Sequence, residues 1–363
     1  MNFEKAALQG EARRNAIKEM ERQADLDTYE NWKDAGNALY ADYKFREALE
    51  KYRNAGKIVR YENYPWQWIE IRIYIGNTEW ELGMRVKGEE SKNLLSSAVD
   101  TYRGVLAVCT REHLPQQWAA TQNNLGNALS NQGIRTGGQA GARLLAQAVT
   151  AFLSALEVRT LKYLPEYWAQ TQNNLATLYE YREKWPDAIQ CYQNVYKVYP
   201  AYAADKLASL YHDRVFRFEK ALEMNRYLVK QDPNNRNALL NLVENLFTIR
   251  NFREGNQLIA KLKTAAKDSP TRLILLTLFE TANFIVLNQK DTAAAQLKIL
   301  VDLVSKQAPG YKPGWIFTGT KHFIRTDKTL EPHRQILLTL FTAFEQTDRE
   351  TILKKLSPLV CKR

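Results

Sequence analysis

The chain has 363 residues, which is too long for one compact helical core and suits two domains or one repeat array. With 45% hydrophobic and 25% charged residues, its composition is that of a folded protein. No apolar run approaches the roughly 20 residues that span a bilayer, so we expect no membrane partner. The net charge of +11 favours an acidic protein segment or nucleic acid, although a basic surface in contact with water explains it equally well.

Residues 1–28 are predicted to form an N-terminal capping helix. Their charged sequence excludes a secretory signal. The chain has three cysteines, Cys109, Cys191 and Cys361, which form no spaced framework. We therefore expect reduced thiols and a cytoplasmic protein.

An internal repeat dominates the next part of the chain. The stretch LPQQWAATQNNLGNAL begins at Leu114, and LPEYWAQTQNNLATLY begins fifty residues later, at Leu164. Each block contains two amphipathic stretches, and a segment that should interrupt a helix, such as the glycine-rich IRTGGQAG, lies between them. We therefore expect each unit to be a helix–turn–helix hairpin. Three features recur at the same spacing: Pro65, Pro115 and Pro165; Trp68, Trp118 and Trp168; Gly76, Gly126 and Ala176.

Small residues recur at one place in each helix of the hairpin. The first helix has Gly36, Gly76, Gly126 and Ala176, and the second has Ala48, Ala98, Ala148, Ala188 and Ala221. An aromatic residue follows the second small residue by four positions in the first four hairpins: Tyr52, Tyr102, Phe152 and Tyr192. Small residues let two helices approach closely, so we expect each aromatic ring to fill the space beside them.

On these positions the chain resembles the tetratricopeptide repeat family. The stretch WKDAGNALYADYKFREALEKYRNAGKIV has the family's signature residues, and the TQNNLATLY phrasing is similar to kinesin light chains and to bacterial signalling arrays. The resemblance implies an all-α, right-handed solenoid of stacked hairpins with helical caps. In the second and third hairpins 22 residues separate the two small positions, against 12 in the first and fourth, which predicts a ten-residue insertion between the helices.

The resemblance also divides the chain. Residues 29–200 hold four well-matched hairpins, and residues 201–304 hold divergent ones, the last of them at 271–304. Residues 305–363 form an aromatic and basic loop followed by a C-terminal helical cap, since solenoids need polar ends.

Asparagines repeat in the middle of the first helices, where this residue is a mediocre helix former. In the family the first helices line the concave surface, and asparagines there hold peptide backbones, so the resemblance implies a peptide-binding groove. The alternative is that the amides bond between neighbouring repeats and set the superhelical twist. The candidate peptide-binding residues are Lys33, Asn37, Arg72, Asn77, Asn123, Asn124, Asn127, Gln170, Asn173 and Asn174.

Lys33 and Asn37 match the start of the carboxylate clamp with which some family members hold the acidic tail of heat-shock chaperones. The rest of the clamp is missing, because Tyr74, Ala120 and Asn124 stand where it needs Asn, Lys and Arg. We therefore expect only a polar groove and not that ligand.

The sequence does not predict an enzyme or a cofactor. His113 follows Cys109 by one helical turn, but the cysteine falls where a small buried residue is expected. No closely spaced Cys/His set indicates zinc, and no glycine-rich phosphate loop is present.

The segment 308–329 combines lysines and arginines with aromatic residues, a mixture that can bind single-stranded nucleic acid. No nucleic-acid fold motif accompanies it, so we favour a loop whose aromatic residues pack under the last helices.

Three functions follow from these observations. The first is a scaffold or adaptor that binds a peptide segment of another protein, extended or acidic, in its concave groove. The second is a regulatory subunit that holds a separate effector, such as a caspase-like protease, in a bacterial signalling or defence system. The third is an RNA-binding solenoid, which the charge of +11 suggests.

Overall fold

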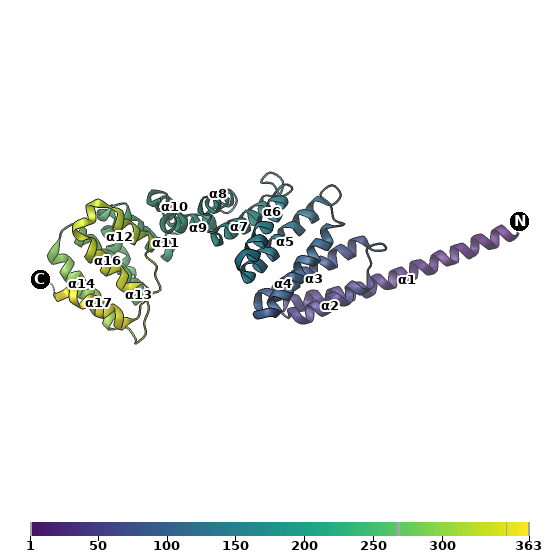
Figure 1. Ribbon diagram of the computed structural model, residues 1–363, viewed down its shortest axis with the longest axis horizontal. Helices are drawn as coiled ribbons and strands as arrows, with labels where there is room; N and C mark the ends of the chain where they lie inside the picture. The colour runs from purple at the N-terminus through teal and green to yellow at the C-terminus, as the bar shows by residue number, and fades with distance from the viewer. Residues whose placement is uncertain (1, 267–268, 346, 362–363) are drawn as a thin grey trace. The chain divides into compact units, whose positions relative to one another are not determined.

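A computed structural model describes residues 2–266, 269–345 and 347–361 (Figure 1). The described residues form α-helices joined by short turns, with one 3₁₀ helix and no strand, so the chain is an all-α solenoid. It divides into two compact units, residues 1–182 (unit 1) and residues 183–363 (unit 2). None of the helices in the described residues is both long enough and apolar enough to cross a bilayer.

Unit 1 is a stack of antiparallel helix pairs. Pairs α1–α2, α3–α4 and α5–α6 pack as hairpins, and the first helices α3, α5 and α7 also contact their neighbours directly. The helices are α1 Asn2–Ala41, α2 Phe45–Ile58, α3 Pro65–Arg85, α4 Gly88–Leu106, α5 Pro115–Thr136, α6 Gly138–Leu156 and α7 Pro165–Tyr181.

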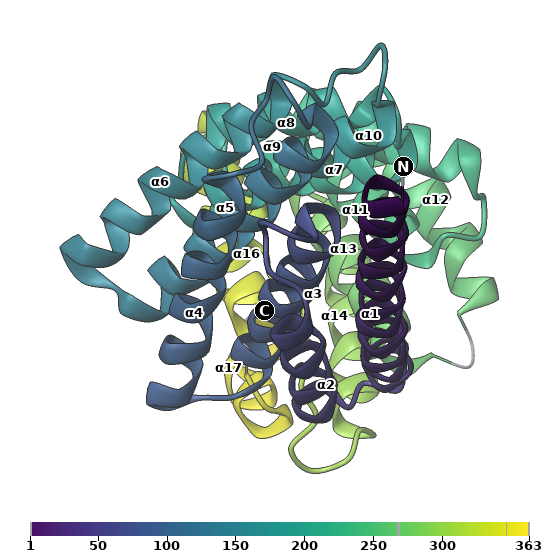
Figure 2. The ribbon, with the colours of Figure 1, turned by 90° about the vertical axis from the view of Figure 1, so that its right-hand side faces the viewer.

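Helix α1 is one uninterrupted helix that runs through the expected division at residue 28. Figure 1 shows its N-terminal part extending beyond α2, and Figure 2 views it from its N-terminal side with α2 beside it. Contacts with the rest of unit 1 begin at Arg22 and Asp25, which both contact Tyr64, and Tyr29 is fully buried, whereas Ile17 and Met20 are exposed. Residues 13–25 of this helix are exposed and rich in charged residues, so they have no apolar stripe that needs cover.

The predicted packing of small residues against aromatic rings is confirmed in the first three hairpins. A Cβ atom on Gly126 would lie 2.6 Å from Cε1 of Phe152, closer than real Cβ contacts allow. Gly36 and Gly76 stand in the same relation to Tyr52 and Tyr102. Only a glycine leaves room for these buried rings.

The insertion in the second and third hairpins lengthens both helices and does not form a loop. Only Gly137 lies between α5 and α6, so most of the IRTGGQAG stretch, which the sequence assigns to a turn, is helical. A Cβ on Gly141 would lie 2.4 Å from the carbonyl oxygen of Gly133. The glycines at Gly133 and Gly141 therefore serve close helix contact, which a composition rule for turns cannot distinguish from chain reversal.

Unit 2 continues with shorter hairpins and ends in a group of C-terminal helices. Its last complete hairpin, α13–α14, lies where the sequence predicts one at 271–304. The helices are α8 Trp185–Tyr196, α9 Pro200–Asp213, α10 Phe218–Gln231, α11 Arg236–Thr248, α12 Phe252–Ala265, α13 Pro270–Val286, α14 Lys290–Ser305, α15 Thr318–Thr326, the 3₁₀ helix η1 Lys328–His333, α16 Arg334–Phe344 and α17 Arg349–Cys361.

The short hairpins share one turn geometry. A non-glycine residue with positive φ precedes each second helix, and the small residue of that helix follows five positions later. This register places Gly255 and Ala293 at the small site of the last two hairpins. The turn residues are Tyr43, Glu183, Phe216, Arg250 and Asn288.

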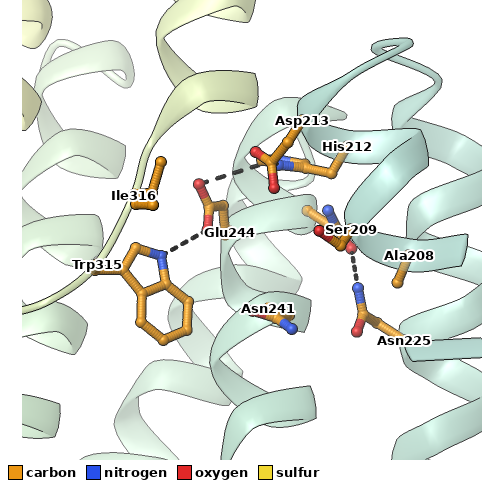
Figure 3. A pocket seen from close by; sticks show the side chains of 10 residues that line it. Ala208, Ser209, His212, Asp213, Asn225, Asn241, Glu244, Trp315 and Ile316 are labelled. Atoms are coloured by element: carbon orange, nitrogen blue, oxygen red, sulfur yellow. Dashed lines mark hydrogen bonds and ion pairs between the residues drawn. The ribbon is translucent and has the colours of Figure 1, made fainter. Parts of the chain in front are cut away.

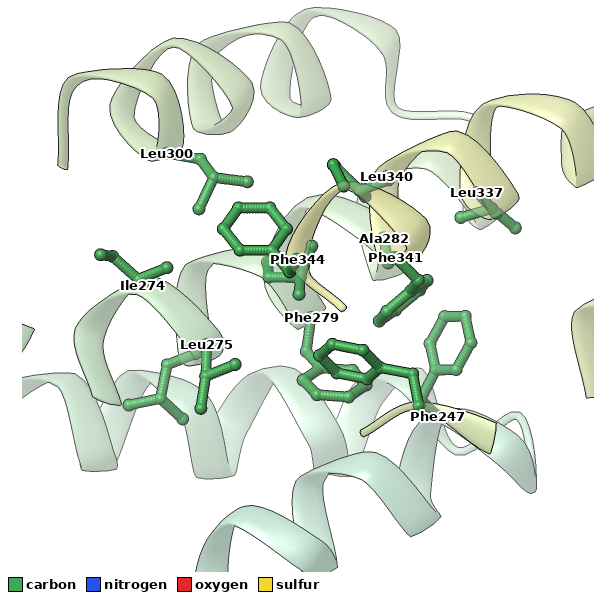
Figure 4. Close-up of a cluster of buried hydrophobic side chains, with 14 of the residues drawn as sticks. Phe247, Ile274, Leu275, Phe279, Ala282, Leu300, Leu337, Leu340, Phe341 and Phe344 are labelled. Atoms are coloured by element: carbon green, nitrogen blue, oxygen red, sulfur yellow. The ribbon is translucent and has the colours of Figure 1, made fainter. Parts of the chain in front are cut away.

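The C-terminal helices of unit 2 cover its own first helices. Helix α15 contacts α9 and α11, and α16 contacts α13. Figure 4 shows the resulting core, in which Phe279 of α13 lies near Phe341 of α16, with a ring-centroid distance of 5.3 Å. Phe317 and Phe344 from the C-terminal segment are fully buried in the same cluster.

Candidate functional site

The repeated asparagines of unit 1 form a hydrogen-bonded chain across three first helices. Asn124 of α5 donates through Nδ2 to Oδ1 of Asn77 on α3, at 3.0 Å. Asn174 of α7 donates in the same way to Oδ1 of Asn123, at 3.2 Å. Within α5, Asn123 donates to Asn124, at 3.3 Å. We call the surface formed by these helices, with Asn77, Asn124, Asn127 and Asn174, the first-helix face.

Asn123 is the most buried member of this chain, with 3% of its surface exposed. Its Oδ1 also accepts from the hydroxyl of Thr171, at 3.1 Å, and Thr171 in turn accepts from Nη1 of Arg159, at 3.0 Å. These bonds join neighbouring repeats, as expected from the alternative in which the amides bond between repeats. A role of the same amides in peptide binding stays a prediction.

Asn127 differs from its equivalents in the preceding repeats. Asn37 accepts a hydrogen bond from the hydroxyl of Tyr52, at 2.9 Å, and Asn77 accepts one from Tyr102, at 2.6 Å. The ring beside Asn127 belongs to Phe152, which has no hydroxyl to donate. Asn127 is half-buried, and the contacts of the described residues include no hydrogen bond to its side-chain amide. Its donor and acceptor sites therefore face the surroundings of α5.

Comparison with solved structures identifies the architecture. The C-terminal part of a TPR repeat-containing protein from Cytophaga hutchinsonii is similar over 76% of this chain and 96% of its own length, with 13% sequence identity and a TM-score of 0.54. The chain has the tetratricopeptide-repeat fold. No protein-family model and no curated protein matches the sequence.

Two other tetratricopeptide repeat proteins have lower TM-scores. A thermophilic one from Thermus thermophilus covers 60% of this chain and 99% of its own, at 18% identity and a TM-score of 0.40. One from Parabacteroides merdae covers 82% of this chain and 98% of its own, at 15% identity and a TM-score of 0.41. Since a fold hosts many functions, the function must be argued from this chain's own residues.

The charged candidates Lys33 and Arg72 lie in different surroundings. The Lys33 ammonium pairs with Glu30 at 2.7 Å and with Glu70 at 3.4 Å, and only 14% of its side chain is exposed. Arg72 stacks on Trp68, with 5.3 Å from its guanidinium carbon to the ring centroid, and lines a groove with residues of α4. Lys33 and Arg72 are thus engaged within unit 1.

Gln170 and Asn173 lie on α7, at the end of the first-helix face. Gln170 is exposed, and its Oε1 is 3.5 Å from Nη1 of Arg159. Asn173 is half-buried. The two residues extend the polar surface that Asn127 begins.

Two buried charges in unit 1 were not among the sequence candidates. Arg159 is 6% exposed and lies over the ring of Tyr167, and burial lowers the pKa of its guanidinium. Glu79 is 2% exposed and accepts from Arg53, Ser97 and Thr101. Neither residue lies in a motif, so no sequence signal distinguishes it from an exposed charge.

Cys109 and Cys191 are unsuited to nucleophilic chemistry. Cys109 is fully buried, and burial raises the pKa of its thiol. Burial, and secondly the charge of Asp187, raise the pKa of Cys191 to about 12. A thiol is a nucleophile only as the thiolate, which these positions disfavour. In the described part of the chain no three His, Cys, Asp or Glu side chains gather as metal ligands.

The aromatic residues of the segment 308–329 pack inside unit 2, as the sequence analysis favoured. Phe317 and Phe323 are buried, and the Tyr311 hydroxyl donates to Oγ1 of Thr271, at 3.1 Å. Lys312 and Lys328 are exposed. The rings that could stack on bases are therefore largely inaccessible.

Proposed function

We propose that the chain is a non-enzymatic scaffold that binds an extended segment of another protein along the first-helix face of unit 1. The observation that supports this most is the Asn127 amide, which lacks the tyrosine hydroxyl that its equivalents bind. An amide offers donors and an acceptor together, as an extended peptide backbone does.

The spacing of the face suits such a ligand. Neighbouring packed helices lie ~8–10 Å apart. An extended peptide advances about 6.6 Å for every two residues, so successive first helices meet its backbone at roughly every third residue. Asn124 and Asn174 each use one N–H in the inter-repeat bonds, and each amide nitrogen has a second. The face can therefore join repeats and contact a peptide at once.

The charge of the chain favours an acidic segment as this partner. The excess of 11 positive charges attracts acidic chains over a distance, which raises association rates more than it fixes geometry. Contacts to backbone groups then hold the segment without selecting its side chains.

The test is a pull-down with the full chain from lysate with and without nuclease treatment. Asn127→Ala should weaken retention of a partner several-fold, since one hydrogen bond contributes ~0.5–1.5 kcal/mol, and should leave the melting temperature unchanged. Asn54→Ala is the matched control, because Asn54 is a half-buried asparagine on the second helix α2. Retention unaffected by nuclease, and reduced only by the Asn127 change, is the expected result.

Asn123→Ala separates binding from folding. It removes the acceptor of Thr171 and Asn174, which should destabilise unit 1 by about 1–3 kcal/mol. Loss of retained material on nuclease treatment would instead favour the RNA-binding alternative. Recovery of a protease would favour the effector-holding one. Equal retention by the Asn127 and Asn54 variants would remove the first-helix face as the binding surface.

A further inference from the structure

Two cavities in the described part of unit 2 differ in character. The smaller, of about 100 Å³, lies beneath the segment that precedes α15, where Figure 3 shows Glu244 of α11 between His212 of α9 and Trp315. Glu244 accepts from Trp315 and Thr320 and faces His212, and the unpaired Nε2 of His212 is enclosed. The polar groups of this cavity are therefore engaged with one another, and the larger cavity is the one that a ligand can enter.

The larger cavity lies at one end of a four-helix bundle in unit 2. Helix α13 contacts α14 and α16, and α17 contacts the same two helices, so the four helices close around one core. At this end of the bundle α13 and α17 stop, whereas α14 and α16 begin. Residues from all four helices line the cavity, which has a volume of about 610 Å³. We call it the end cavity.

The floor of the end cavity is apolar. Leu297 of α14 belongs to the buried core of the bundle. Ile285 of α13 and Leu359 and Val360 of α17 pack against that core but are only half-buried. Part of the apolar surface of the core thus reaches the end cavity. A ligand that covers this surface gains binding free energy in proportion to the apolar area that it removes from water.

The rim of the end cavity is positively charged. Lys290 and Lys298 of α14 are exposed, and neither forms an ion pair with another described residue. His333, at the start of α16, adds an imidazole, and Asp291 is the one carboxylate among the described lining residues. Two lysine charges against one aspartate leave a net positive charge, which favours an anionic group on the ligand.

We propose that the end cavity binds a long-chain carboxylate, such as a free fatty acid, with its chain on the apolar floor and its carboxylate beside Lys290 and Lys298. The volume falls within the roughly 300–1,000 Å³ of small-molecule sites, which are mostly apolar with a few polar groups. A protein partner would need about 20–30 residues on each side, and only 13 residues line this cavity. The proposal does not depend on the first-helix face of unit 1.

The probe is a series of saturated fatty acids from hexanoate to dodecanoate, titrated into the full chain by isothermal calorimetry below micelle-forming concentrations. Each further methylene that enters the cavity contributes about 0.8 kcal/mol, which is roughly fourfold in affinity. We therefore expect one saturable site whose dissociation constant falls by that factor with each methylene until the cavity is filled. No saturable binding, or an affinity that does not change with chain length, would overturn the proposal.

Ligands with other head groups test the charged rim. Decanol is neutral, and decyltrimethylammonium carries the opposite charge on a chain of the same length as that of decanoate. Decanoate should bind about three- to tenfold more tightly than decanol, since exposed ion pairs contribute little each, and should exceed the cation by a larger factor. The double variant Lys290→Gln with Lys298→Gln should lose this preference, whereas Lys354→Gln, an exposed lysine of α17 outside the cavity, should keep it. Equal affinity of the three ligands for the wild-type chain would overturn the proposal.

A matched pair of exposed alanines on α14 locates the site, because Ala294 lines the end cavity and Ala295 does not. Ala294→Phe should fill the cavity and abolish decanoate binding, whereas Ala295→Phe should leave it unchanged. Equal binding by both variants would place the ligand elsewhere and overturn the proposal.

Two other occupants would each replace the fatty acid if decanoate does not bind the wild-type chain. A lysate protein whose retention is lost only in Ala294→Phe would indicate an apolar segment of a partner protein. Dimers of the wild-type chain that only Ala294→Phe dissociates would indicate a second copy. The ligand series uses the wild-type chain, so it stands even if a variant does not fold.

Discussion

The first helices of the two units have opposite surroundings. In unit 1 the principal contacts of α5 are with α3, α4, α6 and α7, the neighbours in its own stack. In unit 2 the helices α9, α11 and α13 are also contacted by α15, η1 or α16 from the C-terminal segment. The two units thus use the same kind of hairpin differently. Helix α5 of unit 1 mainly contacts helices of its own stack, whereas the C-terminal segment covers the first helices of unit 2.

The amino-acid composition of these helices reflects this difference. Helix α5 carries asparagines and glutamines beside its small buried residues. Helix α13 has an almost continuous buried run from Ile274 to Phe279, as expected of a helix that is covered on every side. The composition of a first helix thus predicts whether its face is open or occupied.

The largest loss of stability should follow from truncating a buried side chain of the C-terminal segment that covers the first helices of unit 2. Phe317 is fully buried, 5.1 Å from the ring of Phe341. Phe317→Ala should destabilise unit 2 by about 3–5 kcal/mol, as large-to-small changes in cores do. The neighbouring Ile316→Ala changes an exposed side chain and should remain within about 0.5 kcal/mol. Similar losses in urea denaturation for both variants would show that the cover is not anchored as described.

The sequence predicted most of the fold and less of the site. The hairpins were predicted from motifs that recur every fifty residues and from the positions of small residues. Stacked helices require such residues because they make close contact at fixed places. For residues 305–363 the sequence predicted a packed loop and a C-terminal helical cap, but not which helices they cover, since nothing local in the segment 308–329 specifies its contacts. Asn123 and Asn127 are four residues apart on α5, yet one is buried between repeats and the other has a free amide. The deciding residue, Phe152, is distant in sequence.

A glycine pair in unit 1 should give effects of opposite sign. Gly126→Ala forces a Cβ against Phe152 and should destabilise the chain by ~1–3 kcal/mol. Gly104→Ala, on an exposed part of α4 with no atom near its Cβ position, should stabilise it by ~0.5–1 kcal/mol. Melting temperatures that move in the same direction would contradict the assignment of the packed face.

The covered unit should also respond to pH. Burial lowers the pKa of His212, but the charge of Glu244 and the bond to Asp213 outweigh it, so the net pKa is raised. Burial raises the pKa of Glu244 above its usual 4.5, more than His212 and its hydrogen bonds lower it. Both groups hold protons more tightly in the folded state, so stability falls as pH rises.

The pH range over which stability falls begins near the pKa values of the two groups in the unfolded chain. It ends at their raised pKa values in the folded protein. Hydrogen exchange measured peptide by peptide should show unit 2 less protected at a pH of about 8 than at about 5. Glu244→Gln should reduce this dependence, and the exposed Glu223→Gln should not. A steeper loss of protection in acid than in base would contradict the sign.

The smallest effect concerns the turns, where the hairpins also differ. The lengthened hairpins of unit 1 have glycines with positive φ in their turns, Gly88 and Gly137. In the turn before α8 the residue with positive φ is Glu183, with a φ of 55°. A residue with a Cβ in this conformation destabilises the folded state by about 1–2 kcal/mol through backbone strain. A glycine avoids this strain, but its greater freedom in the unfolded chain costs ~0.5–1 kcal/mol of stability. Glu183→Gly should therefore stabilise the chain by ~0.5–1 kcal/mol in urea denaturation. Glu183→Ala keeps the Cβ that causes the strain and should give no such gain. Equal gains for both variants would trace the effect to the lost carboxylate and would leave the turn unstrained.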